Sequence, residues 1–88
     1  MPGYTVNITD RAQRDIAALA KVVMRRVATA IDGLAANPRP PGALALSGHA
    51  DLYRVRVGDY RVIYLIADAV LVVTVVRVRH RREAYRGM

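Results

Sequence analysis

Apolar and polar side chains alternate at the start of the chain and then change to a helical spacing. Residues 4–8 carry apolar side chains at every second position, which is the period of a β-strand. Thr9 and Asp10 follow, and both residue types cap helix N-termini; Gln13 stands three residues after Asp10, in capping-box spacing. We therefore predict a strand over residues 4–8 and a helix that begins directly after it.

A second helical pattern runs from about Lys21 to Ala36. Its apolar stripe consists of Val23, Val27, Ala30, Ile31 and Leu34. No proline separates the two helical patterns, so Ala20–Lys21 is either a turn or a kink, and we favour a turn that makes a helical hairpin. Three prolines in residues 37–42 end the second helix, and residues 44–50 are expected to form a loop or a short irregular strand.

The period changes to two in the second half of the chain. Residues 52–57 and 60–66 alternate on either side of Gly58–Asp59, a two-residue break suited to a primed hairpin turn. Residues 70–78 are the most hydrophobic strand, which predicts a central place in the sheet. The order β-α-α-β-β-β predicts an α+β fold of two layers, with the helical hairpin packed on one face of an antiparallel sheet. Residues 79–88 are expected to form a short helix or a tail.

Length and composition exclude several classes of protein. The 88 residues are enough for one small domain, spanning residues 1–88. The absence of cysteine excludes disulfide scaffolds, thiolate zinc sites and cysteine nucleophiles, and the wide separation of His49 and His80 argues against a metal site. The longest apolar run, residues 69–76, is too short for a membrane helix, and no signal-peptide pattern is visible. We expect a soluble cytoplasmic protein with no cofactor and no membrane partner.

Positive charge is in excess and unevenly distributed. The chain has 14 Lys and Arg against 7 Asp and Glu, for a net charge of +7. Residues 1–52 contain six basic and four acidic side chains, whereas residues 53–88 contain eight and three. A basic C-terminal half indicates a polyanionic partner, either a nucleic acid or an acidic protein segment.

The predicted hairpin gathers arginines on one face of the sheet. With Gly58–Asp59 as the loop, Arg56 lies opposite Arg61, and Arg54 shares their face. Like charges directly opposite each other destabilise a sheet, and an anion bound between them would remove the repulsion. The alternative is that these are ordinary solvated residues of an exposed strand face.

The C-terminal segment adds groups of the same chemistry. Residues 77–86 contain five arginines, His80 and Tyr85, which offer phosphate ligands, a group that titrates near neutral pH and a ring for base stacking. The sequence has no carboxylate pair, no Walker loop and no Ser/His/Asp set in plausible spacing. These residues still allow metal-free cleavage of RNA, with the RNA's own 2′-hydroxyl as the nucleophile. The alternative is that the segment is only a solvated tail.

Residues 52–64 and 78–86 resemble the RelE/ParE superfamily of type II toxins, and the resemblance extends over about residues 4–86. It implies a RelE-like fold and, for the RelE branch, an endonuclease that cuts mRNA in the ribosomal A site. It further implies a cognate antitoxin, which we expect to present an acidic segment and an amphipathic helix and to form a hetero-oligomer with the toxin. Ribosome and mRNA would be the remaining partners.

The resemblance also implies roles for single residues. By position, the basic pair on the first hairpin strand falls on Arg54 and Arg56, and the arginine that stabilises the transition state falls on Arg61. A second phosphate-contacting arginine falls on Arg81, and a base-stacking tyrosine on Tyr85.

The departures from the family pattern concern proton transfer. RelE enzymes often have lysines where this chain has Arg54 and Arg56, and arginine stays protonated, so it is a poor general base. Either His80 acts as the acid or base, or charge stabilisation matters more than a base; His80 as a surface neighbour of the site is the alternative. Arg79 and Arg82 are expected to contact substrate.

Two other functions stay open. The ParE branch acts on DNA gyrase and generally lacks this residue set, so the presence of Arg61, Arg81 and Tyr85 together favours the RelE branch. A basic module that binds RNA or protein without catalysis is the third possibility.

Overall fold

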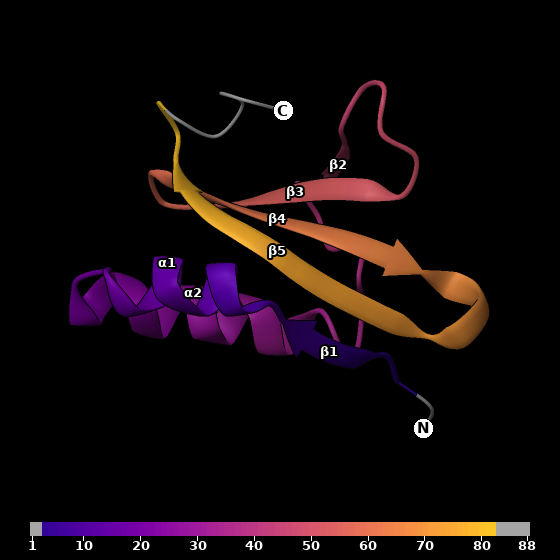
Figure 1. Ribbon diagram of the computed structural model, residues 1–88, viewed down its shortest axis with the longest axis horizontal. Coiled ribbons are helices and arrows are strands. Elements are labelled where there is room, and N and C mark those ends of the chain that lie inside the picture. The colour runs from indigo at the N-terminus through magenta and orange to yellow at the C-terminus, as the bar shows by residue number, and fades with distance from the viewer. Residues whose placement is uncertain (1–2, 83–88) are drawn as a thin grey trace.

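Two helices and five strands form two layers in the computed structural model, which describes residues 3–82 (Figure 1). The elements are β1 (Thr5–Ile8), α1 (Asp10–Ala17), α2 (Lys21–Gly33), β2 (Leu44–Ala45), β3 (Leu52–Val57), β4 (Tyr60–Ala67), a single 3-10 turn (Asp68–Val70) and β5 (Val72–His80). Both helices lie against the same face of the sheet, and no helix of the described residues covers the other face. The predicted two-layer α+β fold is confirmed.

The strands follow the spatial order β1-β5-β4-β3-β2. Strands β3 to β5 form the predicted antiparallel meander. The short strand β2, in the segment expected to be a loop or a short irregular strand, pairs antiparallel with β3, and β1 pairs in parallel with β5. The central strand is β4, and β5 lies beside it with β1 on its other edge, so the predicted central place of the most hydrophobic strand is wrong by one position. That strand also begins at Val72 instead of residue 70, because Asp68–Val70 form a helical turn and Leu71 has a φ of 55°.

The predicted helix stripe forms the core. Val27, Ile31 and Leu34 of the stripe are buried, together with Ala12 of α1. They pack on the uncharged face of the sheet, whose buried members are Val55, Val57, Val62, Tyr64, Ile66, Val73, Val75 and Val78. The helices therefore cover one face, and the charged side chains of the strands are left on the other.

The local signals around the helices are mostly confirmed. The N-cap of α1 is Thr9, whose Oγ1 accepts a hydrogen bond from the Ala12 amide at 3.1 Å. Asp10 is the first helical residue, so the predicted capping box with Gln13 does not form; the Gln13 side chain donates to the Ile8 carbonyl instead, at 3.0 Å. The chain turns at residues 18–20, which confirms the helical hairpin, and α2 ends at Gly33, three residues before its predicted end. Neither helix is long and apolar enough to cross a membrane, for the residues that the structure describes.

The β3–β4 hairpin has the predicted register. Val57 pairs with Tyr60, Arg56 with Arg61, and Arg54 with Ile63. Gly58 has a φ of 59°, a left-handed conformation that glycine adopts without strain, which explains why the loop begins with this residue.

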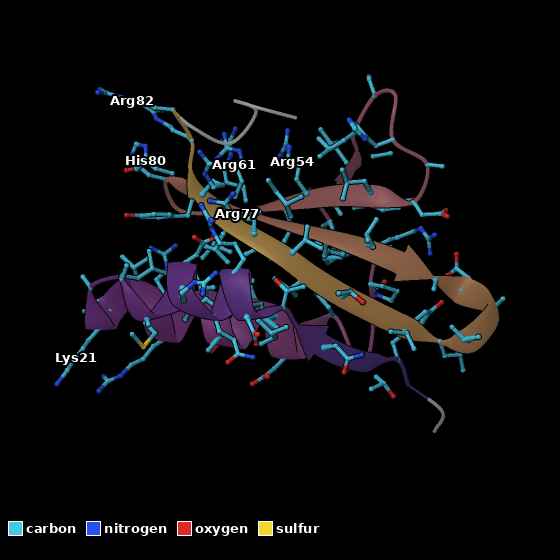
Figure 2. The ribbon with its side chains drawn as sticks, in the orientation of Figure 1. Lys21, Arg54, Arg61, Arg77, His80 and Arg82 are labelled. Atoms are coloured by element: carbon cyan, nitrogen blue, oxygen red, sulfur yellow. The ribbon has the colours of Figure 1, made fainter. Side chains whose placement is uncertain are left out.

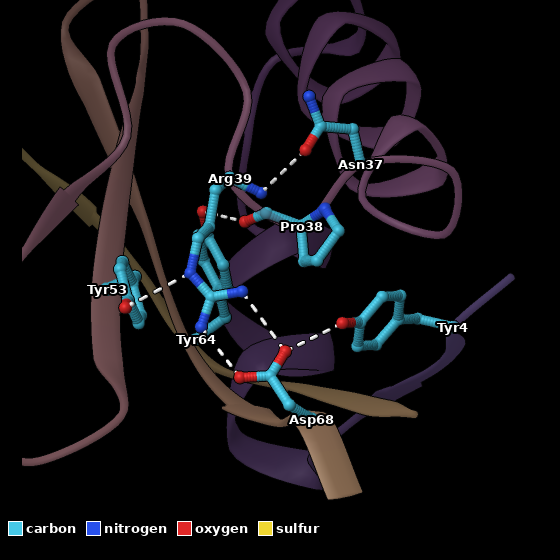
Figure 3. Close-up of polar contacts among 7 residues, drawn as sticks. All are labelled: Tyr4, Asn37, Pro38, Arg39, Tyr53, Tyr64 and Asp68. Atoms are coloured by element: carbon cyan, nitrogen blue, oxygen red, sulfur yellow. Dashed lines mark hydrogen bonds and ion pairs between the residues drawn. The ribbon is translucent and has the colours of Figure 1, made fainter. Parts of the chain in front are cut away.

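A polar network holds the proline-rich loop after α2 against the far end of the sheet (Figure 3). The Arg39 guanidinium donates two hydrogen bonds to Asp68, at 3.1 and 2.8 Å, and one to the Tyr53 hydroxyl at 3.2 Å. The Tyr4 hydroxyl donates to Asp68 at 2.6 Å, and the buried Tyr64 hydroxyl donates to the Pro38 carbonyl at 2.8 Å. The Arg39 and Tyr4 hydrogen bonds lower the pKa of Asp68 to about 2, and burial raises the pKa of Tyr64 to about 12.

Candidate functional site

Three arginines form a row across neighbouring strands on the sheet face that the helices leave uncovered. Arg56 of β3 pairs with Arg61 of β4, and Arg61 pairs with Arg79 of β5. The next row of the ladder holds Arg54, Ile63 and Arg77. Figure 2 shows Arg54 and Arg61 extending from the sheet on the side away from the helices. We call Arg56, Arg61 and Arg79 the arginine row.

The sequence predicted two members of this row but missed the position of the third. Arg56 and Arg61 come from one hairpin, whose two-residue loop fixes their register. Arg79 was assigned to a basic tail because the strand was expected to end at residue 78, whereas β5 continues to His80. A signal was present in the alternation of Arg77, Val78 and Arg79, which continues the period of the strand.

Arg61 is buried, and part of its guanidinium has no partner among residues 3–82. Its relative exposure is 9%, and its Nε and Nη1 atoms are buried without a hydrogen-bond partner among the described residues. The two ion pairs within residues 3–82 join Arg39 to Asp68 and Arg77 to Asp15, so they do not involve the arginine row. An unsatisfied buried donor costs on the order of 1–3 kcal/mol, and like charges on both neighbouring strands add to this cost. An anion bound at Arg61 would accept hydrogen bonds from the free donors and would offset the repulsion between the arginines.

Arg77 differs from the arginine row because it forms an ion pair. Its Nε donates to Asp15 of α1 at 2.8 Å, and the same carboxylate oxygen accepts the Val78 amide at 2.9 Å. Burial alone would raise the pKa of Asp15, but the Arg77 and Val78 hydrogen bonds and the charges of Arg77 and Arg11 outweigh it and hold the pKa below its usual value. Asp15 thus pairs with the free edge of β5 beyond the end of β1 and fixes Arg77, which Figure 2 shows above α1.

The structure does not bring His80 into the arginine row. His80 pairs with Tyr60 and follows Arg79 on the strand, so its side chain leaves the opposite face from Arg79. Its ring meets the Tyr60 ring edge-on, with centroids 5.4 Å apart, and its Nδ1 accepts the Arg82 amide at 3.3 Å. Figure 2 shows His80 beyond the hairpin end of the sheet, separate from Arg54 and Arg61.

The remaining predicted residues follow β5. The Arg81 amide donates to the Asp59 carbonyl at 2.7 Å, which ties the chain after β5 to the β3–β4 turn. The side chains of Arg81 and Arg82 are exposed. Tyr85 lies outside the described residues, as does the predicted helix or tail beyond residue 82. Within residues 3–82, no group of three or more His, Asp or Glu side chains is placed to hold a metal ion.

This arrangement is suited to an anion whose charge is spread over several oxygens. Neighbouring strands lie about 5 Å apart, so the three arginines of the row leave the sheet from adjacent ladder positions. Each guanidinium is planar and permanently charged, and it matches the geometry of phosphate oxygens. The central group is held in a largely dry environment, where its attraction for an anion is stronger than in water.

Comparison with known proteins identifies relatives over nearly the whole chain. The family model for the ParE toxin of the type II toxin–antitoxin system parDE matches residues 6–85. Toxin RelG of Mycobacterium tuberculosis is 33% identical over 84 residues, which are 94% of this chain and 97% of the relative.

Solved structures agree in fold. The toxin chain of the archaeal RelE–RelB complex from Pyrococcus horikoshii is 32% identical, with a TM-score of 0.82, and the match covers 96% of this chain and all of the other. A chain of the RelBE2 toxin–antitoxin complex of Mycobacterium tuberculosis is 31% identical, with a TM-score of 0.79 and coverages of 90% and 99%. Together with the family model, these matches show that the chain belongs to the RelE/ParE superfamily of type II toxin–antitoxin toxins.

Proposed function

We propose that this toxin is a ribosome-dependent endoribonuclease that cuts mRNA without a metal ion. The buried guanidinium of Arg61, in the middle of the arginine row and with two nitrogens unpaired within residues 3–82, is the observation that carries the proposal. A buried charged side chain that destabilises a small domain is expected to bind a ligand, because an apolar residue at the same position would not destabilise the fold in this way. The message and the ribosome would be its partners, and the cytoplasm its place of action.

The reaction that suits this site is an internal transfer of the phosphodiester. The RNA 2′-oxygen attacks the adjacent phosphorus and loses its proton, and the bond from phosphorus to the 5′-oxygen breaks. The 5′-oxygen takes up a proton, so the products are a 2′,3′-cyclic phosphate and a 5′-hydroxyl. Negative charge on the equatorial oxygens is greater in the transition state than in the substrate, and Arg61 and Arg81 are assigned to stabilise it.

The other basic residues are assigned to binding. Arg54 and Arg56 hold the scissile and flanking phosphates, and Arg79 and Arg82 extend the contacts along the strand of RNA. Tyr85 is assigned to stack on a base, so that the 2′-oxygen lies in line with the leaving 5′-oxygen. Because His80 faces away from Arg61, the geometry favours the alternative in which charge stabilisation contributes more than proton transfer by His80.

Mapping new 5′ ends on mRNA after incubation with programmed ribosomes tests the proposal. We expect wild-type protein to produce 5′-hydroxyl ends and a 2′-deoxy nucleotide at the cut site to abolish cleavage. Cleavage of the deoxy substrate at the RNA rate would contradict the 2′-hydroxyl mechanism. An intact message together with loss of gyrase supercoiling activity would instead establish the ParE-type function, which the family model match keeps as the second candidate.

Substitutions separate the assigned roles. Arg61→Ala and Arg81→Ala should each slow cleavage by about 10²–10³-fold, the usual loss for a transition-state donor, and should abolish growth arrest. Lys21→Ala is the matched control, because Lys21 is exposed on α2, carries the same charge and lies far from Arg61 (Figure 2). If Arg61→Ala stayed fully toxic, the site would lie elsewhere.

The proposed protein partner is a cognate antitoxin with an acidic segment and an amphipathic helix. The similar chains from Pyrococcus horikoshii and Mycobacterium tuberculosis were solved in complexes with RelB-type partners, which supports this proposal. Acidic side chains on such a segment would pair with the arginines that otherwise contact RNA.

A further inference from the structure

A second basic surface lies beside the arginine row, in a cleft between α1 and the free end of β5. Its lining includes Arg11 and Arg14 of α1, Arg77 and Arg79 of β5, and the rings of Tyr60 and His80. We call this the α1–β5 cleft. Because Arg79 belongs both to the arginine row and to the cleft, the two surfaces are continuous.

The charge of the cleft is strongly unbalanced. Four arginines line it against one acidic residue, Asp15. That carboxylate already accepts hydrogen bonds from Arg77 and from the Val78 amide, so it is committed to the edge of β5. Arg11, Arg14 and Arg79 form no ion pair with any of residues 3–82. The cleft therefore keeps three uncompensated guanidinium groups for a ligand.

Two aromatic rings give the cleft a second property. Tyr60 and His80 are half-buried and meet edge-on at 5.4 Å, so their orientation is fixed by each other and by the ladder between their strands. Basic side chains interleaved with aromatic rings are the arrangement by which proteins bind single-stranded nucleic acid, with phosphates on the cations and bases on the rings. A cleft that served an acidic peptide would need the cations but not the rings.

We propose that the α1–β5 cleft binds one further nucleotide of single-stranded RNA, outside the pair of nucleotides joined by the reacting phosphate. Its phosphate lies against Arg11, Arg14 and Arg79, and its base packs on the Tyr60–His80 pair. This inference rests on the proposed function, because it takes RNA as the ligand and the arginine row as the reacting centre. It gives His80 a binding role on the face where the structure places it.

Binding of RNA that cannot react tests the cleft without depending on cleavage. The probes are two fluorescently labelled oligouridylates, one of about twelve nucleotides and one a dinucleotide that is too short to extend from the arginine row into the cleft. Both are 2′-O-methylated throughout, and affinity is measured by anisotropy over a range of salt concentrations. The test variant is Arg11→Gln/Arg14→Gln, and the control is Lys21→Gln, which removes a positive charge from an exposed position of α2 away from the cleft and from the arginine row; the two are compared per charge removed. Thermal unfolding of each variant checks the fold.

We expect the α1 variant to bind the long probe roughly tenfold or more weakly than wild type, and to show a salt slope lower by about 0.7 for each phosphate that its side chains no longer neutralise. The α2 control should be affected much less, and the short probe should bind all three proteins alike. His80→Ala should weaken binding of the long probe roughly fivefold or more, because the base would have one ring fewer to stack on. Equal reductions in affinity per charge removed for the α1 and α2 variants would mean that only net charge matters, and would overturn the proposal.

Two further outcomes distinguish a failure of the cleft proposal from a failure of the proposed endoribonuclease function. If the α1 variant bound the antitoxin more weakly but RNA as tightly as wild type, the cleft would be a protein-docking surface and the proposal would be overturned. If wild-type protein left mRNA intact on programmed ribosomes, the proposed function would fail. Selective loss of RNA binding by the α1 variant would still establish the cleft as a nucleotide site.

Discussion

At the scale of single residues, Arg39 and Arg61 differ in what surrounds their guanidinium groups. Arg39 donates three side-chain hydrogen bonds and lies over the Tyr53 ring, 5.0 Å from its centroid, whereas Arg61 is buried without a partner among the described residues. The first arrangement stabilises the fold. The second opposes it and is expected where a residue is kept for function.

Thermal unfolding separates these two kinds of arginine. Arg61→Met removes the unsatisfied donors and the repulsion within the arginine row, so we expect the protein to gain about 1 kcal/mol and a Tm higher by about 4–8 °C, with toxicity lost. Arg39→Met removes a bidentate ion pair and should lower the Tm. A lower Tm for Arg61→Met would mean that the guanidinium has a structural partner, and would weaken its assignment to RNA.

The Arg39–Asp68 pair predicts a pH dependence of stability. Its hydrogen bonds lower the pKa of Asp68 from 3.8 to about 2, so the ionised carboxylate stabilises the folded state above pH 3.8, and this contribution is lost as the pH falls through about 2. Asp68→Asn should therefore lower the Tm at neutral pH, and the difference from wild type should shrink between about pH 4 and pH 2.

Asp32→Asn is the matched control for this series, because Asp32 is exposed on α2 and forms no ion pair with any of residues 3–82. Its Tm relative to wild type should change little over the same range. A difference between wild type and Asp68→Asn that stayed constant with pH would contradict the role given to the ion pair.

The same residues show where sequence reasoning stops. Arg54, Arg56 and Arg61 were placed on one face because a two-residue loop fixes the register of one hairpin. Arg39 and Asp68 are 29 residues apart in a loop and a turn, and no local period relates such positions. Their pairing depends on how the loop after α2 packs on the end of the sheet, which only the tertiary structure defines.

At the scale of elements, periodicity predicted which elements exist and which face each one buries. The parallel pairing of β1 with β5 was missed, because a strand of four alternating residues indicates a buried face but not the direction of its neighbour. The extension of β5 to His80 was not predicted, because a run of basic residues is typical of a solvated tail as well as of a strand whose outer face is exposed.

Leu34 tests the packing of α2 on the sheet. It has no exposed surface and follows directly after α2, at the end of the apolar stripe that contacts the sheet. Leu34→Ala should destabilise the protein by about 2–5 kcal/mol, which chemical denaturation would measure. Val22→Ala is the control, because Val22 of α2 is 70% exposed and its truncation should change the free energy of unfolding little. An unchanged stability for Leu34→Ala would contradict the packing assigned to the stripe.

At the scale of the whole molecule, two chemical surfaces share the sheet face that the helices leave uncovered. The arginine row lies toward the β3–β4 turn, and the exposed side chains of Leu44 and Leu65 lie farther along the same face. A partner that covers this face therefore meets positive charge at one end and apolar surface at the other. RNA complements only the first, whereas an amphipathic acidic segment complements both.

This division predicts how the antitoxin and RNA differ in their response to salt. Both should bind more weakly as salt is raised, but the antitoxin should have the shallower slope, because its apolar contacts are not screened. Leu65→Thr, a change on an exposed strand position, should weaken antitoxin binding and leave cleavage on the ribosome intact; Val22→Thr on α2 should change neither. Isothermal titration over a range of salt concentrations would measure the antitoxin affinities. A cognate antitoxin without acidic character, or one whose affinity is independent of salt, would mean that it neutralises the toxin away from the arginine row.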